Sequence, residues 1–320
     1  MTTSSPDLTI TIAVLTYKRL DQLVPLVAEL REQANSFDGR VDILVVDNDP
    51  DASARHGASR ALGASGRYVH EPEPGIAAAR NRALREADSS LLVFIDDDEV
   101  PVEGWLVQLV DEYMRSWPVA VVGPVVSTYE AKPEPWIEAG RFFTRRRLAS
   151  GTRVDVAATN NLLLDLAWLR ARGIEFDDKF GLSGGSDTLF SRQIVAAGGE
   201  MVWCDEAVVY DVVPSSRSTR EWVLQRAYRS GNSWSRSSLA LQSDLLGRTL
   251  TRGTLLAQGS VRLVGGFAKS LVGSISHNMV AEAMGTRTRL RGAGMLSGAM
   301  GHVYSEYSRP TSVNPMTEKV

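Results

Sequence analysis

Three consecutive aspartates are the residues of this chain whose type and spacing point most directly to chemistry. Asp96, Asp97 and Asp98 follow the apolar segment Leu91–Ile95, which reads LLVFI. Carboxylates two positions apart at the end of a strand can share one divalent cation with the diphosphate of a nucleotide, and such oxygen ligands favour Mg²⁺ or Mn²⁺. Taken alone, the three residues also fit a solvated acidic turn. Because polar residues follow other predicted strands as well, we expect a metal site here.

Three further polar residues have local patterns that allow a role in ligand binding or catalysis. Asp47 ends the segment VDILVV and either accepts a hydrogen bond from a nucleobase or ribose, or caps the next turn. Arg80 lies in GIAAARNR, where small residues allow close approach and a guanidinium can clamp phosphate. Asp187 precedes a predicted helix over 188–197, as its cap or as a general base. The local patterns leave both alternatives open for each aspartate.

Strands and helices alternate in the first part of the chain and must position these residues. Apolar, β-branched segments such as TITIAVL predict strands, and apolar residues spaced three and four apart predict helices. The predicted strands cover 9–15, 41–46, 67–70, 91–95 and 120–126, and the predicted helices cover 21–33, 75–87 and 105–117. This alternation indicates an α/β fold with a mostly parallel, Rossmann-like sheet flanked by helices. Ligands of such sheets bind beyond the carboxyl ends of the strands, where Thr16–Arg19, Asp47–Asp49 and Asp96–Glu99 meet.

Composition excludes several other classes of protein. The 320 residues include a single cysteine, Cys204, so neither a disulfide framework nor a cysteine-based zinc site is expected. The four histidines have no zinc-hydrolase spacing. The first residues, MTTSSPD, lack the features of a signal peptide, and no run of 18 apolar residues predicts a conventional membrane span. We therefore expect a cytoplasmic protein, with peripheral contact at the inner face of the cell membrane as an open alternative.

Charge divides the chain into an acidic and a basic part. Residues 1–214 carry a net charge of −12 and residues 215–310 carry +9. We predict a flexible N-terminus over 1–8, an α/β domain that carries the ligand site over 9–214, a helical extension over 215–310 and a flexible tail over 311–320. Glycine, serine and arginine interrupt the apolar residues after 245, which predicts short amphipathic stretches. The basic part either faces an anionic membrane or acceptor, or packs as a helical layer on the catalytic domain or in a homodimer.

Several segments together resemble the family 2 inverting glycosyltransferases, which have the GT-A fold. The matching segments occur in family order over about residues 9–235 and are VLTYKR, ILVVDN, GIAAARNRAL, VFIDDDE, TNNLLL, GGSDTLFSRQ and QRAYRSGNSW. The C-terminal third is similar to bacterial exopolysaccharide transferases of the succinoglycan type. The resemblance implies a nucleotide diphosphate sugar as donor, with a UDP-sugar favoured, and a glycan, lipid-linked or small-molecule acceptor. It implies no nucleic-acid partner.

The same resemblance assigns roles on the donor side. Thr16 would line the nucleotide site, Asp47 would contact the base, and Arg80 would lie near the phosphates. Asp97 would contribute to binding the nucleotide sugar as the middle residue of an Asp-x-Asp motif. The outer residues of that motif would hold Mg²⁺ or Mn²⁺, with Asp98 as the direct ligand alongside Asp96.

The resemblance also assigns the base and the acceptor side, with departures from the family pattern. Asp187 matches the second residue of the family's Glu-Asp pair and would be the catalytic base, while Ser186 replaces the usual glutamate. Asp211 stands where many members have histidine, which leaves its role open. Three residues loosely resemble an acceptor-side Gln-x-x-Arg-Trp segment without its spacing, and they are Gln225, Arg226 and Tyr228.

These assignments predict sugar transfer by metal-assisted single displacement, with inversion and no covalent intermediate. Two alternatives belong to other classes of protein. Loss of the glutamate at Ser186 leaves open a non-catalytic nucleotide-sugar or glycan-binding module. A nucleotidyltransferase would need a glycine-rich phosphate loop after the first strand, and the segment TYKRLDQL has no glycine there.

Overall fold

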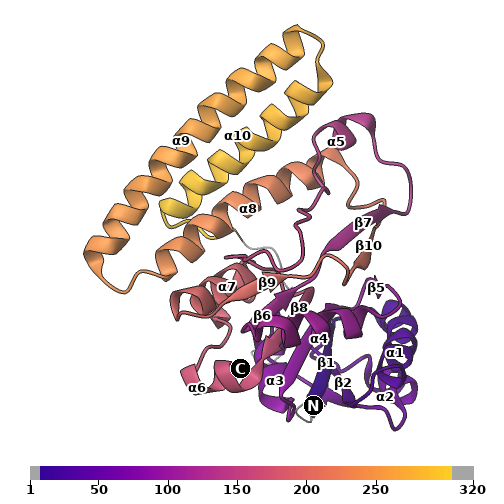
Figure 1. Cartoon of the computed structure of the whole chain (residues 1–320). Coiled ribbons are helices and arrows are strands. Elements are labelled where there is room, and N and C mark those ends of the chain that lie inside the picture. Colours follow the sequence, from indigo (N-terminus) through magenta and orange to yellow (C-terminus); the bar gives the residue numbers. More distant parts are fainter. Residues whose placement is uncertain (1–7, 305–320) are drawn as a thin grey trace, which may run out of the picture.

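A computed structural model describes residues 8–304 and shows a central sheet covered by helices on both faces (Figure 1). The seven strands of this sheet are, in spatial order, β3 (Gly66–His70), β2 (Arg40–Asp47), β1 (Thr9–Thr16), β4 (Leu91–Asp96), β8 (Asn161–Asp165), β6 (Ala120–Val122) and β9 (Met201–Trp203). The first four are parallel to one another, and β8 is antiparallel to both of its neighbours. The expected α/β fold with a mostly parallel sheet is confirmed.

The register of the parallel strands places their carboxyl ends level with one another. Thr16 lies opposite Asp47 across β1 and β2, and Leu15 lies opposite Asp96 across β1 and β4. Successive side chains point to opposite faces, so that Ile12 packs into one apolar cluster and Ala13 into the other. Both are fully buried, as expected for strands covered on both sides. The polar residues that follow these strands therefore share one edge of the sheet.

Helices form a layer on each face of the sheet. One face is covered by α1 (Leu20–Asn35), α2 (Arg55–Leu62) and α4 (Trp105–Ser116). The other is covered by α3 (Ile76–Glu86), α6 (Leu166–Arg172) and α7 (Ser186–Ala196). In α1, the apolar residues Leu23, Leu26, Val27 and Leu30 are buried, as their helical spacing predicts.

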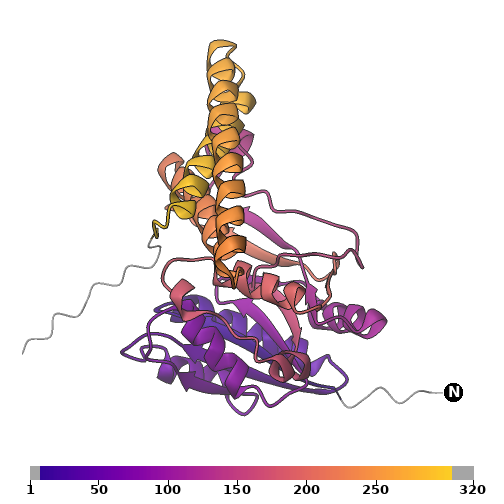
Figure 2. The ribbon, with the colours of Figure 1, turned by 90° about the vertical axis from the view of Figure 1, so that its left-hand side faces the viewer.

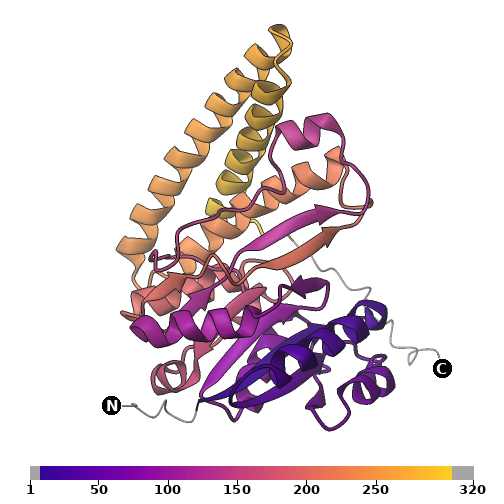
Figure 3. The same cartoon turned by 45° about the vertical axis from the view of Figure 1, so that its right-hand side comes forward.

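A second, three-stranded sheet lies between the central sheet and the C-terminal helices (Figure 3). Its strands, in spatial order, are β5 (Glu99–Pro101), β10 (Val209–Val213) and β7 (Val125–Tyr129). The single strand predicted over 120–126 was wrong, because the chain leaves the central sheet at Gly123 and Pro124 and continues in this second sheet. Proline has no N–H to donate to a ladder, and a Cβ at Gly123 would lie 2.2 Å from Nδ2 of Asn161.

The segment 130–153 is anchored by packing. It contains the short helix α5 (Pro135–Ala139), and its aromatic residues pack with apolar residues of β10, α8 (Arg220–Ala240) and α10 (Met279–Ala299). The buried aromatic residues of this segment are Trp136, Phe142 and Phe143. A 3₁₀ turn, η1 (Asp178–Phe180), follows α6 and leads toward α7.

Three helices form a layer that projects from the rest of the molecule (Figures 1 and 2). They are α8 (Arg220–Ala240), α9 (Leu245–Ile275) and α10 (Met279–Ala299), and we call them the helical arm; residues 8–214 are the body. The prediction of short amphipathic stretches was wrong, because α9 is one helix of 31 residues. Asp244 and Asn278 cap α9 and α10 by accepting backbone N–H groups.

The predicted division into domains stays a prediction, although its boundary at 214 falls in the link between β10 and α8. The predicted flexible ends, 1–8 and 311–320, lie outside the described residues except for Leu8. Within residues 8–304, no helix combines the length and the apolar character that crossing a membrane requires.

Candidate active site

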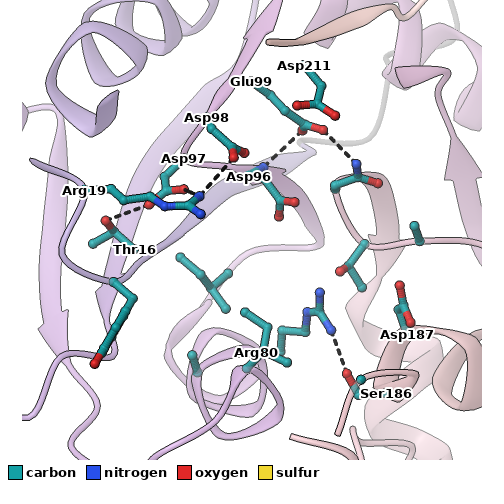
Figure 4. Close-up of a pocket in the computed structure, with 18 of the residues that line it drawn as sticks. Thr16, Arg19, Arg80, Asp96, Asp97, Asp98, Glu99, Ser186, Asp187 and Asp211 are labelled. Atoms are coloured by element: carbon teal, nitrogen blue, oxygen red, sulfur yellow. Dashed lines mark hydrogen bonds and ion pairs between the residues drawn. The ribbon is translucent and has the colours of Figure 1, made fainter. Parts of the chain in front are cut away.

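One cavity of about 740 Å³ lies at the carboxyl edge of the parallel strands and extends to α8. Its volume is in the range of ordinary small-ligand sites. Seven of the ten site residues predicted from the sequence line it, and they are Thr16, Arg80, Asp96, Asp97, Asp98, Asp187 and Arg226. Figure 4 shows the acidic cluster near Thr16 and Arg19, with Asp187 on the other side of the view. The cavity thus lies where the sequence predicted it, at the edge of the sheet where the polar residues that follow the parallel strands meet.

A guanidinium stands between two carboxylates of the acidic cluster. Nη1 of Arg19 donates to Oδ1 of Asp97 at 3.1 Å and to Oδ2 of Asp98 at 2.9 Å. Thr16 Oγ1 donates to the other oxygen of Asp97 at 2.8 Å, and Nη1 of Arg217 lies 3.6 Å from Asp98. Asp97 and Asp98 are thus held at a position where positive charge collects.

Two neighbouring carboxyl groups lie in a more crowded corner of the cavity. Glu99 is buried and accepts hydrogen bonds from Nδ2 of Asn160 at 2.7 Å and from the backbone N–H of Asp96 at 3.2 Å. Desolvation, reinforced by the charge of Asp98, raises the pKa of Asp96 to about 7. Desolvation also raises the pKa of Glu99 well above its usual range. Ionisation of both carboxyl groups is unfavourable because they are buried close to other carboxylates. A cation bound nearby would stabilise their charged forms.

The acidic cluster fits a divalent ion that takes only part of its ligands from the protein. Among residues 8–304, no group of three histidine, cysteine or carboxylate side chains is arranged to hold a metal ion. Magnesium in nucleotide sites is usually bound by one or two carboxylates, with phosphate oxygens and water completing the shell. Asp98 and Asp96 meet that requirement, and the guanidinium of Arg19 shows that cationic groups are accepted there.

Arg80 is a nearly buried cation that joins two helices at the floor of the cavity. Its Nη1 donates to Oγ of Ser186 at 2.7 Å, and its guanidinium lies 5.4 Å from the ring centroid of Phe176. Because Ser186 is neutral, this hydrogen bond does not compensate the charge of Arg80. Its positive charge is available to an anionic group in the cavity.

Asp187 lies in the first turn of α7, where it accepts one local backbone hydrogen bond and also lines the cavity. Its Oδ1 accepts the backbone N–H of Thr188 at 2.7 Å. The turn before it contains Gly184 and Gly185 at φ values of 74° and 91°, and a Cβ at Gly185 would lie 2.9 Å from Cβ of Ser233. Close packing against α8 thus fixes the direction in which Asp187 enters the cavity.

Asp47 does not line the cavity and has the capping role that the sequence left open. It is fully buried, and its carboxylate accepts backbone N–H groups of Asp49 and Ala54 at 3.0 and 3.1 Å. It also accepts the hydroxyl of Tyr68 at 2.8 Å. With these three bonds the carboxylate stabilises the turn after β2, and its contact with a base stays a prediction. The next residue, Asn48, lines the cavity instead.

Helix α8 presents three side chains to the cavity, and only one of them is among the residues predicted from the sequence. Trp222, Arg226 and Arg229 line the cavity, with the spacing of four and three residues that defines one helical face. Gln225 is exposed and pairs with Glu221, and Tyr228 packs edge-on against Tyr304. Of the three predicted residues, only Arg226 reaches the cavity.

An aromatic and cationic wall is therefore built mainly by α8. The rings of Phe143 and Trp222 are stacked, with centroids 5.7 Å apart. The guanidinium of Arg226 lies about equally far from both rings, at 5.5 and 5.4 Å. The wall combines flat apolar faces with positive charge, in contrast to the acidic cluster across the cavity.

Among the cavity residues that were not placed at the site from the sequence are Arg145, Asn160 and Arg217. Arg19 and Glu99 belong to the polar strand ends that were predicted to meet there, although neither was given a role of its own. Arg145 comes from the distant segment 130–153, and its Nη2 donates to Oδ2 of Asp211 at 2.7 Å. Asp211, whose role was open, is thus a partner of Arg145 in the wall of the cavity. No local pattern links these two residues, because only the fold brings them together.

Comparison with known proteins identifies the family. The family model described as "Glycosyl transferase family 2" matches residues 11–169. The chain is also 32% identical over 230 residues to the succinoglycan biosynthesis protein ExoM of Rhizobium meliloti (strain 1021), covering 71% of this chain and 74% of that protein. The chain belongs to glycosyltransferase family 2. It is therefore a glycosyltransferase similar to those of exopolysaccharide synthesis.

A solved structure supports the fold assignment. The mannosyltransferase PcManGT from Pyrobaculum calidifontis, in complex with GDP-Man and Mn²⁺, matches with a TM-score of 0.63. The match covers 92% of this chain and 88% of that one at 15% identity, which is a likeness of fold. Our chain therefore has the GT-A fold with a helical C-terminal extension, as its resemblance to family 2 glycosyltransferases implied. The family model ends before Asp187, so the role of that residue does not follow from it.

Proposed function

We propose that this glycosyltransferase transfers a sugar from a nucleotide diphosphate sugar to an acceptor hydroxyl by single displacement with inversion. The observation that carries the proposal is the placement of two kinds of carboxylate on one cavity. The cluster Asp96–Asp98 lies at the strand edge, and Asp187 enters from α7. The first arrangement suits the diphosphate of a donor, and the second suits a hydroxyl nucleophile.

On the donor side, Asp98 with Asp96 would hold Mg²⁺ or Mn²⁺. The ion, when bound, offsets the negative charge that builds on the leaving diphosphate. Thr16 keeps Asp97 in place through its hydroxyl, and Arg80 directs positive charge toward the phosphates. Arg19 and Arg217 both contact Oδ2 of Asp98, so the carboxylate has a second oxygen that it would offer to an ion. We favour a UDP-sugar as the donor. Because PcManGT was solved with GDP-Man, GDP-sugars should be tested as donors alongside UDP-sugars.

On the acceptor side, Asp187 is proposed as the general base. It removes the hydroxyl proton as the oxygen bonds to the anomeric carbon, while the bond from that carbon to the diphosphate oxygen breaks. Attack from the face opposite the leaving group inverts the anomeric centre. The stacked rings of Phe143 and Trp222 offer a flat surface to an acceptor. Among glycan, lipid-linked and small-molecule acceptors, the arginines beside these rings favour one that carries phosphate.

The competing function is a non-catalytic nucleotide-sugar or glycan-binding module, suggested by the serine at 186. Against it, Asp96, Asp98 and Asp187 all line the cavity. The test is a panel of nucleotide sugars with Mn²⁺, with nucleotide release and product mass both measured. Release and a glycosylated product support transfer. Tight binding of a donor with neither release nor product, across acceptors with and without phosphate, would support the binding module.

A further inference from the structure

The outer face of α9 exposes large apolar side chains in its first turns, over 245–250, and along its second half, over 261–275. Nine of them expose between 48% and 81% of their surface, and they are Leu245, Leu246, Leu250, Val261, Val264, Phe267, Leu271, Val272 and Ile275. The body, with more than 200 residues, exposes eight such side chains, which are scattered over separate elements. Scattered apolar residues are normal on a protein surface, whereas a contiguous group marks a contact surface.

The apolar face of α9 is free of charge. At 100° per residue, Leu246, Leu250, Val264 and Ile275 fall within one narrow arc, and the other exposed apolar residues extend it to either side. The charged residues of α9 all lie on the other half of the helix, and they are Arg248, Arg252, Arg262 and Lys269. The helix is thus amphipathic, with its apolar half turned away from the protein.

The inner face of α9 is occupied by glycines in contact with α10. A Cβ at Gly266 would lie 2.4 Å from the backbone nitrogen of Arg289, and one at Gly273 would lie 2.3 Å from that of Glu282. Gly285 of α10 meets the backbone of Ser270 in the same way. The two backbones are in direct contact, so α9 cannot rotate its larger side chains inward. Helix pairs with small residues between them and apolar residues outside are typical of a lipid environment.

The arm also places this face where a broad surface can reach it. Figure 1 shows α9 along the outer edge of the molecule, with α10 and then α8 between it and the body. In Figure 2, where this edge faces the viewer, α9 runs in front of the other elements of the arm. A helix of this length extends about 46 Å. A planar partner can therefore contact the whole helix without meeting the body.

We propose that α9 docks lengthwise on an anionic lipid surface, with its apolar face at the boundary between headgroups and acyl chains. Charge selects this partner over a second copy of the chain. α9 has four basic and no acidic residues, and residues 215–304 carry a net charge of +9. A second arm would bring the same positive charge, whereas anionic headgroups compensate it. The inference is independent of sugar transfer, since this face lies on the far side of the arm from the cavity.

The first experiment is flotation of the full chain with vesicles. The vesicles contain phosphatidylcholine alone or mixed with phosphatidylglycerol, at low and at high salt. We expect the protein to float with the anionic vesicles at low salt and to bind more weakly at high salt, because salt screens surface charge. We expect no flotation with phosphatidylcholine alone.

Matched variants locate the contact. Val261→Asp combined with Val264→Asp places two charges on the apolar face, and partition should fall at least about tenfold. The control is Val24→Asp, a half-exposed valine of α1 in the body, which should leave flotation unchanged. Arg248→Gln and Arg252→Gln should each lower partition about fivefold. Circular dichroism and nucleotide release in solution, unchanged in every variant, would show that the fold and the cavity are intact.

Three outcomes would overturn the proposal. The first is a full-length protein that stays unbound at low salt and sediments as a dimer that Val264→Asp dissociates, which would assign the face to a second copy. The second is a protein that neither floats nor dimerises. The third is an equal loss of flotation in the Val24→Asp control, which would show that the body and not α9 makes the contact.

Discussion

The body and the helical arm bury opposite kinds of side chain. In the body, large apolar residues such as Ile12, Leu44 and Phe94 are buried and hold the helices onto the sheet. In the arm, glycines such as Gly266 and Gly285 are buried, and the large apolar residues of α9 lie outside. The body is stabilised by the hydrophobic effect without any partner, because its large apolar side chains are already buried away from water. The arm has a smaller apolar cluster around Leu255 and Met295, and it gains further stabilisation of this kind when something covers the outer face of α9.

The two regions also differ in charge, and they meet at the cavity. The body contributes the acidic cluster, whereas α8 of the arm contributes Arg226 and Arg229 beside Trp222. Arg217, in the link between the two regions, contacts Asp98 at 3.6 Å. Under the proposed function, the acidic and basic parts of the chain serve one site, with the metal and the donor bound by the body and the acceptor bound by the arm.

The largest expected effect concerns the body. Asp98→Asn removes the charge of the proposed metal ligand while keeping its shape, so divalent-dependent turnover should fall by about 10³-fold or more. Nucleotide release measured across a range of Mn²⁺ concentrations checks this. The fold should be unchanged, with circular dichroism as control, and flotation through α9 should persist. Full activity of this variant in EDTA would exclude the metal role.

The second effect separates donor binding from transfer. Asp187→Asn should retain nucleotide binding and lower turnover by roughly 10²–10⁴-fold, the usual range for a lost general base. Calorimetric titration with the nucleotide and product formation by mass spectrometry provide the two readouts. The matched control is Asp178→Asn, an aspartate outside the cavity lining, which should keep its turnover. Weakened donor binding with near-normal turnover would make Asp187 a structural cap instead.

The third effect tests the packing of α9 glycines against the backbone of α10. It compares two glycines of α9. A Cβ at Gly266 would meet the α10 backbone, whereas one at Gly253 would meet nothing within 4 Å. Gly266→Ala should therefore lower the free energy of unfolding of the arm by about 1–3 kcal/mol. Gly253→Ala should raise it by up to about 1 kcal/mol, because alanine favours the helix. Urea denaturation and limited proteolysis measure both, and equal stability of the two variants would contradict the packing.

The smallest effect is a pH dependence that belongs to the body alone. The pKa of Asp96 is raised to about 7, so a proton competes with the cation below that pH and is absent above it. Mn²⁺ affinity should rise by up to about tenfold per pH unit below 7 and level off above it. Calorimetry from pH 6 to 8 measures the affinity, and Asp96→Asn should flatten the profile. Constant affinity in the unaltered protein over this range would contradict the proton competition.

The sequence alone determined the catalytic edge of the sheet. Apolar strands followed at once by polar residues are a local pattern, and parallel strands necessarily end at one edge, so Thr16 and Asp96–Asp98 were predicted together. The same pattern could not tell Asp47 from Asn48. Which of two adjacent side chains faces the cavity depends on the unpaired N–H groups of the following turn, and those are set by the path of the chain.

Contacts between distant segments were decided by the tertiary structure. The pairs Arg145 with Asp211 and Arg19 with Asp98 join residues more than 60 positions apart. The choice of Arg226 over Gln225 and Tyr228 follows from the face that α8 turns toward the cavity. Helical spacing predicts which residues share a face but carries no information about what that face contacts.

α9 shows the same limit most clearly. Its glycines have low helix propensity and divide the apolar residues into short groups, which is why short stretches were predicted. In the structure the glycines are the points of closest contact with α10, and this packing compensates for their low propensity. Composition and periodicity determined that the region is basic, helical and amphipathic. Only the packing of backbone against backbone decided that its apolar half faces outward, because a helix presents its larger side chains wherever its neighbour leaves room.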